Sequence, residues 1–190
     1  MKYIIVGLHS SGKQEVIDTL LEEGISCGRL FTNADLIDDR YDFFTDDDIR
    51  DIFENKAYIF IKELETESMI NCYEGLSFYE FDNNDVFAMS PDQVNAIPSQ
   101  SLRDEVCFIW MDCSDTQRLN RYKEEKRSYN WSKQEEIEKR NINDFIKNIY
   151  NTQRSHLLYF VNEDPQRVAA IIYSLVKHPD LLTIFEKKYK

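Results

Sequence analysis

The chain of 190 residues is long enough to bury one continuous core, and its 42% hydrophobic and 31% charged residues are typical of a folded protein. Its formal net charge of −12 argues against a surface that binds nucleic acid or anionic lipid, so an anionic small ligand would need a local positive pocket. No apolar run approaches the roughly 20 residues of a membrane span, and the N-terminus lacks the features of a signal peptide. We therefore expect one domain in a cytoplasmic protein that binds neither nucleic acid nor membrane.

The first predicted elements are a buried strand and a helix, separated by a loop. Residues 3–6 are an apolar run that ends at a glycine. After the loop, Val16, Ile17 and Leu20 recur at helical spacing, and Gly24 is a typical C-terminal stop. A second helix is predicted over residues 45–56, with Thr45 as its N-cap.

The middle of the chain predicts strands over residues 57–68 and 72–81, a turn at 82–85 and a short apolar run at 86–89. Residues 105–113 have the strongest pattern of a buried strand, and a helix is predicted to follow them over 116–127. The polar stretch after it is typical of two helices, with apolar residues recurring periodically at Ile137, Ile142, Phe145, Ile146 and Ile149. A last strand over 157–164 and a helix that Pro165 opens over 165–177 complete the chain.

Strands that alternate with helices predict an α/β fold, with a parallel sheet covered by helices on both faces. The aromatic segment 57–81 interrupts this alternation and predicts a small antiparallel insertion in the same domain. The cysteines show no C-x-x-C spacing, so we expect reduced, packed thiols at Cys27, Cys72, Cys107 and Cys113. With only three scattered histidines, these thiols do not suggest a metal site.

The motif "GLHSSGKQ", residues 7–14, follows the first strand and fits the phosphate-loop pattern G-x-x-x-x-G-K-[ST] up to its last position. In such a loop, backbone N–H groups and the positive end of the following helix hold phosphates. The residues that would supply these groups are Ser10, Ser11, Gly12, Lys13 and Gln14, and Lys13 would bridge the β- and γ-phosphates. The alternative is a strand–helix turn in which Gly7 and Gly12 only permit tight geometry, and that alternative does not need Lys13.

Gln14 stands where a hydroxyl normally meets magnesium. Its amide oxygen is a longer ligand and does not reproduce a hydroxyl. Either magnesium is held mainly by the nucleotide and water, or catalysis is impaired.

A cationic stretch follows the strand at 105–113 and contains Arg118, Arg121, Lys123, Lys126 and Arg127, with Arg140 further along. Guanidinium groups stabilise a transferring phosphoryl group, and a mobile segment can deliver them. The alternative is a solvated helix whose cations pair with neighbouring glutamates; it is favoured for the lysines, and the two explanations stay balanced for Arg118 and Arg121.

A third group, aromatic and acidic, falls in or near the predicted insertion: Tyr41, Tyr58, Glu63, Tyr73, Ser77 and Tyr79. Tyrosine hydroxyls could orient a phosphate or a base. For each residue alone, packing in the core of the insertion is the simpler explanation.

In the order of these parts the chain resembles the guanylate kinase family of nucleoside monophosphate kinases. The segments that carry the resemblance are "YIIVGLHSSGK", "YDFFTDDDIRDIFENKAYI", "CYEG", "DTQRLNR" and "YFVNEDPQRV". The resemblance implies a P-loop core over 1–32 and 83–190, an insertion that binds the nucleoside monophosphate over about 33–82, and a lid over about 118–140. It also implies ATP and Mg²⁺ as cofactors and nucleotides as substrates.

The resemblance assigns Gly7, Gly12 and Lys13 to the phosphates of ATP, and Tyr41 and Tyr73 to the phosphate of the acceptor. It places Arg118 and Arg121 at the lid arginines, which with Lys13 would be the catalytic residues. Arg127 also falls in the lid, and Arg140 matches a later lid arginine. Arg40 and Glu63 are the nearest substitutes for acceptor-binding residues that the chain lacks.

The departures from the family concern the acceptor and the metal. The two family arginines that bind the acceptor phosphate fall in "FTNADLIDD", where Asn33 stands, and the guanine-reading acidic residue falls on Phe60. A further acidic residue falls at Met89 or Ser90. Two hypotheses therefore stay open: ATP-dependent phosphoryl transfer to a nucleoside monophosphate that need not be GMP, or a binding module that lost catalysis and uses the insertion for a protein partner.

Overall fold

The computed structural model describes residues 1–34, 41–64, 71–98, 106–124, 131–151, 155–161 and 164–184. The elements follow one another in this order: β1 (Lys2–Gly7), α1 (Lys13–Glu22), β2 (Leu30–Thr32), β3 (Tyr41–Phe43), α2 (Asp46–Asn55), β4 (Tyr58–Glu63), β5 (Tyr73–Ser77), α3 (Phe78–Asn83), β6 (Val86–Met89), α4 (Pro91–Asn95), β7 (Val106–Asp112), α5 (Asp115–Glu124), α6 (Trp131–Asn151), β8 (Ser155–Val161), α7 (Pro165–Lys177) and a 3₁₀ turn, η1 (Pro179–Leu181).

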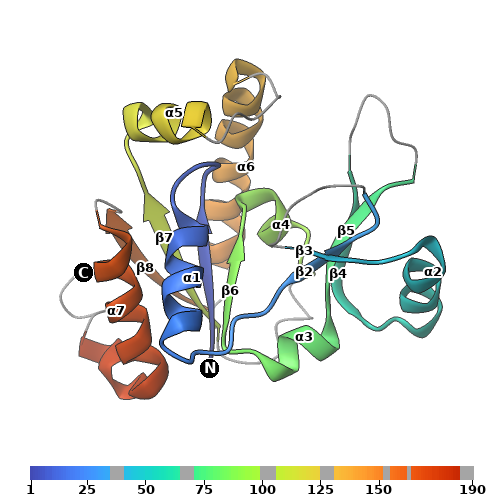
Figure 1. Ribbon diagram of the computed structural model, residues 1–190, viewed down its shortest axis with the longest axis horizontal. Coiled ribbons are helices and arrows are strands. Elements are labelled where there is room, and N and C mark those ends of the chain that lie inside the picture. The colour runs from blue at the N-terminus through green and yellow to red at the C-terminus, as the bar shows by residue number, and fades with distance from the viewer. Residues whose placement is uncertain are drawn as a thin grey trace.

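The main sheet is parallel and has the strand order β6-β1-β7-β8. Its register pairs Val6 with Met89 and Gly7 with Met111. The carboxyl ends of β6, β1 and β7 therefore meet at one edge, which is where open α/β sheets hold their ligands. The predicted phosphate loop leaves the sheet from this edge (Figure 1).

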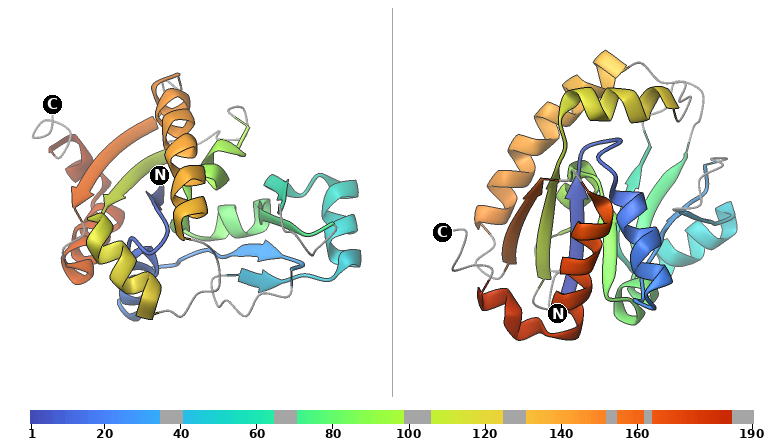
Figure 2. Two further views of the ribbon diagram at one scale, coloured as in Figure 1. Left: turned by 90° about the horizontal axis from the view of Figure 1, so that it is seen from above. Right: turned by 60° about the vertical axis from the view of Figure 1, so that its left-hand side comes forward.

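Two cores lie on opposite faces of the main sheet, because successive side chains of β1 point to opposite sides. Tyr3 and Ile5 pack with α1 and α7, whereas Ile4 and Val6 pack with α4, α6 and the smaller sheet. Figure 2 shows α1 and α7 together on one side of the sheet and α6 on the other. The predicted layering of helices on both faces is confirmed.

The smaller sheet has the order β3-β2-β5-β4 and extends away from the main sheet together with α2 (Figure 1). Its strands β4 and β5 are antiparallel, as expected for the insertion, but β3 runs parallel to β2. The insertion sheet is thus mixed rather than purely antiparallel. The strands β2 and β3 have three residues each, too few to show an alternating pattern in the sequence.

Two predicted elements were wrong in extent. The strand expected over 72–81 ends at Ser77, whose hydroxyl accepts a hydrogen bond from the Glu80 N–H and starts α3. Residues 131–151 form one helix of 21 residues rather than two. The capping box at Thr45 and Asp48 is present, as predicted. Within the described residues, no helix combines the length and the apolar character that crossing a membrane requires.

Candidate functional site

The segment from Gly7 to Gln14, called the phosphate loop from here on, connects the end of β1 to the start of α1. Ser10 and Gly12 both adopt left-handed backbone conformations, with φ of 55° and 89°. The Ser11 N–H turns back to the Leu8 carbonyl at 3.2 Å. Alternation of left-handed and right-handed residues ahead of a helix produces a concave row of N–H groups that suits an anion.

Gly7 has no room for a side chain. A Cβ atom there would lie 2.6 Å from the Ser11 Oγ and 2.9 Å from the Met111 carbonyl oxygen of the neighbouring strand. Ser11 is 1% exposed. The glycine therefore lets the loop fold tightly over the sheet edge, as a phosphate loop and a plain strand–helix turn both require.

Lys13 folds back over the loop that precedes it. Its Nζ donates hydrogen bonds to the carbonyls of Gly7 at 2.7 Å and Leu8 at 2.9 Å. This places a positive charge beside the concave N–H row, in keeping with the predicted phosphate site.

Gln14 does not turn toward the loop. Its Nε2 donates to the Asp18 Oδ1 at 2.8 Å, along the exposed side of α1. The chain thus offers no hydroxyl at the usual magnesium position, and Gln14 does not fit as a metal ligand. Among the residues that the structure describes, no group of three His, Cys, Asp or Glu could hold a metal ion.

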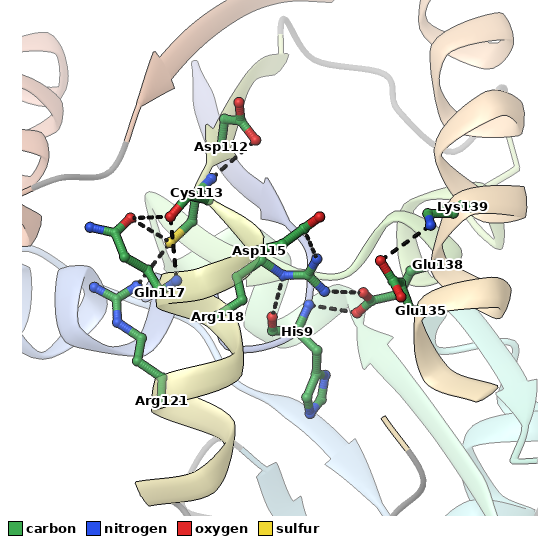
Figure 3. Close-up of polar contacts among 11 residues, drawn as sticks. His9, Asp112, Cys113, Asp115, Gln117, Arg118, Arg121, Glu135, Glu138 and Lys139 are labelled. Carbon is green, nitrogen blue, oxygen red and sulfur yellow. Dashed lines mark hydrogen bonds and ion pairs between the residues drawn. The ribbon is translucent and has the colours of Figure 1, made fainter. Parts of the chain in front are cut away.

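Arg118 comes from α5 and contacts the phosphate loop directly (Figure 3). It is 2% exposed, and its Nε donates to the His9 carbonyl at 3.0 Å. Its two terminal nitrogens bind Asp115 at 3.2 Å and Glu138 at 2.5 Å. Its guanidinium carbon lies 5.0 Å from the centre of the Trp131 ring. The sequence predicts Arg118 as a lid arginine, and the structure gives it a buried position in which its nitrogens bind protein groups.

Arg121 lies one turn further along α5 and contacts the first turn of α1, just after the phosphate loop. Its Nη2 lies 3.4 Å from a Glu15 carboxylate oxygen in the first turn of α1, and its Nη1 lies 3.5 Å from the Cys113 Sγ. Burial raises the pKa of the Cys113 thiol, although the guanidinium groups of Arg121 and Arg118 act to lower it. None of the four cysteines forms a disulfide. Arg118 thus contacts the loop itself, and Arg121 contacts the start of the helix that follows it.

Of the remaining predicted lid residues, Arg140 is exposed on α6. Arg127 lies outside the described residues.

On the acceptor side, Tyr41 joins a polar network with Lys62, Glu74, Asp92 and Gln93. The Tyr41 hydroxyl donates to a Glu74 carboxylate oxygen at 2.8 Å, and the Gln93 amide donates to the same oxygen at 2.9 Å. The Lys62 Nζ binds the other Glu74 oxygen at 2.8 Å and also contacts Asp92. The network links β3, β4 and β5 of the smaller sheet to α4, which follows β6.

Within this network, the interaction between Lys62 and Asp92 favours the charged form of each. Burial acts to lower the pKa of Lys62, but the carboxylates of Glu74 and Asp92 outweigh it, so that the pKa of Lys62 is raised. Burial likewise acts to raise the pKa of Asp92, yet the Lys62 ammonium and hydrogen bonds from Lys62 and Ser90 hold that pKa below its usual value. The network contains two acids and one base, which is a poor match for an anionic acceptor.

The other residues predicted for the acceptor are scattered. The ring of Tyr73 packs edge-on against Phe53, and its N–H donates to the Asn33 side-chain oxygen at 2.7 Å. Glu63 is exposed at the end of β4. Arg40 lies outside the described residues.

Phe60 and Met89, two positions at which the sequence departs from the guanylate kinase pattern, are each 1% exposed and belong to the core.

Glu138, Glu74 and Lys62 were not predicted. The signal for Glu138 is its place on α6: it lies four and seven residues before Ile142 and Phe145, on the apolar face of the helix. A lone acid on that face indicates a buried partner. For Glu74 and Lys62 the signal is weaker, because charged residues are common in short, partly exposed strands.

No protein-family model matches the chain, and no curated protein matches it in sequence. Among solved structures, the guanylate kinase from Anaplasma phagocytophilum is similar at a TM-score of 0.56 and 16% sequence identity, over 93% of this chain and 84% of that chain. The gluconokinase from Sinorhizobium meliloti 1021 aligns at a TM-score of 0.45 and 12% identity, over 99% of this chain and 95% of that chain. At 16% identity the first likeness shows the fold alone. The chain has an α/β fold that is similar to the fold of this guanylate kinase.

Proposed function

We propose that this chain transfers a phosphoryl group from ATP to a small acceptor. The phosphate loop binds the phosphates of ATP through its N–H groups and Lys13, while Arg121 reaches the first turn of α1 from α5. Catalysis of this kind works by positioning and electrostatic stabilisation, without a covalent enzyme intermediate. The proposal rests on the loop that leads into α1, in which Ser10 and Gly12 have left-handed backbone conformations and the Lys13 side chain folds back over the loop.

The acceptor is a nucleoside monophosphate that need not be GMP, or another small acceptor. Phe60 is buried where the resemblance places the acid that reads guanine, and the Tyr41 hydroxyl is bound to Glu74. A network of two carboxylates and one ammonium group favours acceptors that carry less negative charge near it.

The test combines ATP binding with turnover. We expect Lys13→Ala to weaken ATP binding, measured by calorimetry, by about tenfold or more, because it removes a charge-assisted contact to phosphate. Lys177→Ala is the matched control, since Lys177 stands in the last turn of α7 and contacts the Tyr173 ring. Equal ATP affinity in wild type and Lys13→Ala would overturn the proposed site.

Turnover is measured by ADP release in the presence of each nucleoside monophosphate in turn. Release with at least one acceptor, lost in Lys13→Ala, is the expected result. Lys13-dependent ATP binding without release for any small acceptor would instead support the non-catalytic binding module, which the turned-away Gln14 favours.

A further inference from the structure

Glu138 binds the phosphate loop from outside the motif. One of its carboxylate oxygens accepts a hydrogen bond from the His9 N–H at 2.6 Å, and the other accepts from the Arg118 Nη2 at 2.5 Å. Arg118 in turn donates to the His9 carbonyl at 3.0 Å. Figure 3 shows Glu138 reaching from α6 to both partners. Glu138 and Arg118 therefore occupy the backbone N–H and the backbone carbonyl of His9.

A carboxylate at a loop N–H has the same chemistry as a phosphate oxygen. Both are anions that accept from backbone N–H groups and from guanidinium groups. An N–H that donates to Glu138 is not available to a phosphate, and the negative charge repels a polyphosphate nearby. Glu138 is 5% exposed, so water screens this charge weakly.

Glu138 also offsets the charge of Arg118. The guanidinium faces two carboxylates, those of Asp115 and Glu138, and stacks on Trp131. Its positive charge is thus compensated within the protein, although it lies against the loop. An arginine that served only to attract phosphate would not need a buried acid of its own.

We propose that Glu138 opposes nucleotide binding at the phosphate loop. The His9 N–H directly precedes the donors at residues 10–14 that the motif predicts, and Glu138 occupies it, so that the nucleotide's phosphates cannot use it as a further donor. Glu138 also competes with the phosphates for the charge of Arg118, and it thereby lowers the affinity for the phosphate chain. This inference rests on the proposed function, since it requires nucleotide phosphates at the loop.

Competition and a purely structural role predict opposite results. If the ion pair only braces the loop, then neutralising Glu138 loosens the loop and weakens ATP binding. If Glu138 competes, then neutralising it lowers the thermal stability of the free protein, because Arg118 loses its partner, and at the same time strengthens ATP binding.

The test uses Glu138→Gln in the full chain. We expect ATP to bind about tenfold more tightly by calorimetry, the size of effect that follows from removing one competing charge-assisted hydrogen bond. The melting temperature without ATP should fall, while the shift that ATP causes should grow.

The control is Glu135→Gln, which removes the same charge one turn earlier on α6, where Glu135 pairs with Lys139 at 3.2 Å. Its ATP affinity should stay within about twofold of wild type.

Glu138→Asp provides a second variant that keeps the charge and the ion-pairing chemistry if the glutamine variant fails to fold. Its shorter side chain draws the carboxylate back from His9, so ATP should bind at least about threefold more tightly. Unchanged or weaker ATP binding in the folded Glu138 variants would overturn the inference, provided that wild type binds ATP and Lys13→Ala weakens that binding. If wild type and Lys13→Ala bind ATP equally, the proposed function fails instead.

Discussion

At the scale of single residues, Gly7 decides how the phosphate loop lies on the sheet. The two atoms nearest to an added Cβ are the Ser11 hydroxyl and a backbone carbonyl of β7. The hydroxyl can rotate away, but the carbonyl is fixed, because Met111 is held in the register of the main sheet. A larger residue at position 7 must therefore move the loop.

We expect Gly7→Ala to lower the free energy of unfolding by about 1–3 kcal/mol through overpacking, and to weaken ATP binding, because the loop shifts as a unit. Urea unfolding and calorimetry measure the two effects. Gly24→Ala is the control: Gly24 has a φ of 76°, so alanine is strained there, but nothing lies within 4 Å of its Cβ. The control should lose stability and keep its ATP affinity. An unchanged affinity in Gly7→Ala would show that the loop tolerates the shift.

At the scale of elements, α7 completes one face of the main sheet, and its first turn depends on a single side chain. The Asp164 Oδ1 accepts from the N–H groups of Gln166 at 3.0 Å and Arg167 at 3.4 Å. Pro165 occupies the first helical position, where no N–H is needed. The apolar face of the helix then packs against α1 through Val168, Ile172 and Leu175.

We expect Asp164→Ala to lower the free energy of unfolding by about 1 kcal/mol, because two N–H groups lose their cap. Asp164→Asn keeps an acceptor oxygen and should stay close to wild type. Thermal unfolding of the two variants side by side measures the difference. Equal losses in both would assign the effect to charge instead of capping.

Much of the element order follows from local patterns, because apolar runs and caps act over a few residues. The phosphate loop, the capping box of α2 and the proline start of α7 are such signals. The alternating pattern predicts that residues 78–81 continue the strand, but they belong to a helix, because the Ser77 side chain caps its first turn. Glu138 was missed because its partners, His9 and Arg118, are distant in sequence, and a pattern within one helix does not identify them.

At the scale of the whole molecule, the Lys62 network joins the two sheets. Lys62 lies on β4, and its partners Glu74 and Asp92 lie on β5 and α4. Glu74 has a side chain that is 5% exposed, so it depends on this ammonium group and on the donors Tyr41 and Gln93. The smaller sheet is thus held against the core by charge as well as by apolar contact.

We expect Lys62→Met to lower the free energy of unfolding at pH 7 by about 2 kcal/mol, less than for a fully buried pair because water screens Lys62 and Asp92 in part. Because the pKa of Asp92 is lowered, its ionised carboxylate stabilises the fold at neutral pH, and this stabilisation is lost as pH falls through that pKa. Because the pKa of Lys62 is raised, its ammonium group stabilises the fold fully at neutral pH, and this stabilisation is lost as pH rises through that pKa.

The difference between wild type and Lys62→Met should therefore be constant near neutral pH and shrink below about pH 4, as Asp92 gains a proton. Urea unfolding at several pH values measures it. Lys139→Met removes a surface ion pair instead and should cost less than about 0.5 kcal/mol at any pH. A Lys62→Met difference that persists at pH 2 would assign the loss to packing of the lysine stem.

The parallel order β6-β1-β7-β8 also bears on how the chain is made. The central strand β1 leaves the ribosome before either neighbour, since Tyr3 pairs with Val86 and Lys2 pairs with Val106. Until those segments emerge, an apolar run that is destined for the middle of the sheet has no native partner. Sheets closed by such distant pairings form slowly, and their exposed strands are prone to aggregate. Newly synthesised chains are therefore exposed to misassembly until β7 has been made, and a chaperone that shields residues 2–7 would act in that interval.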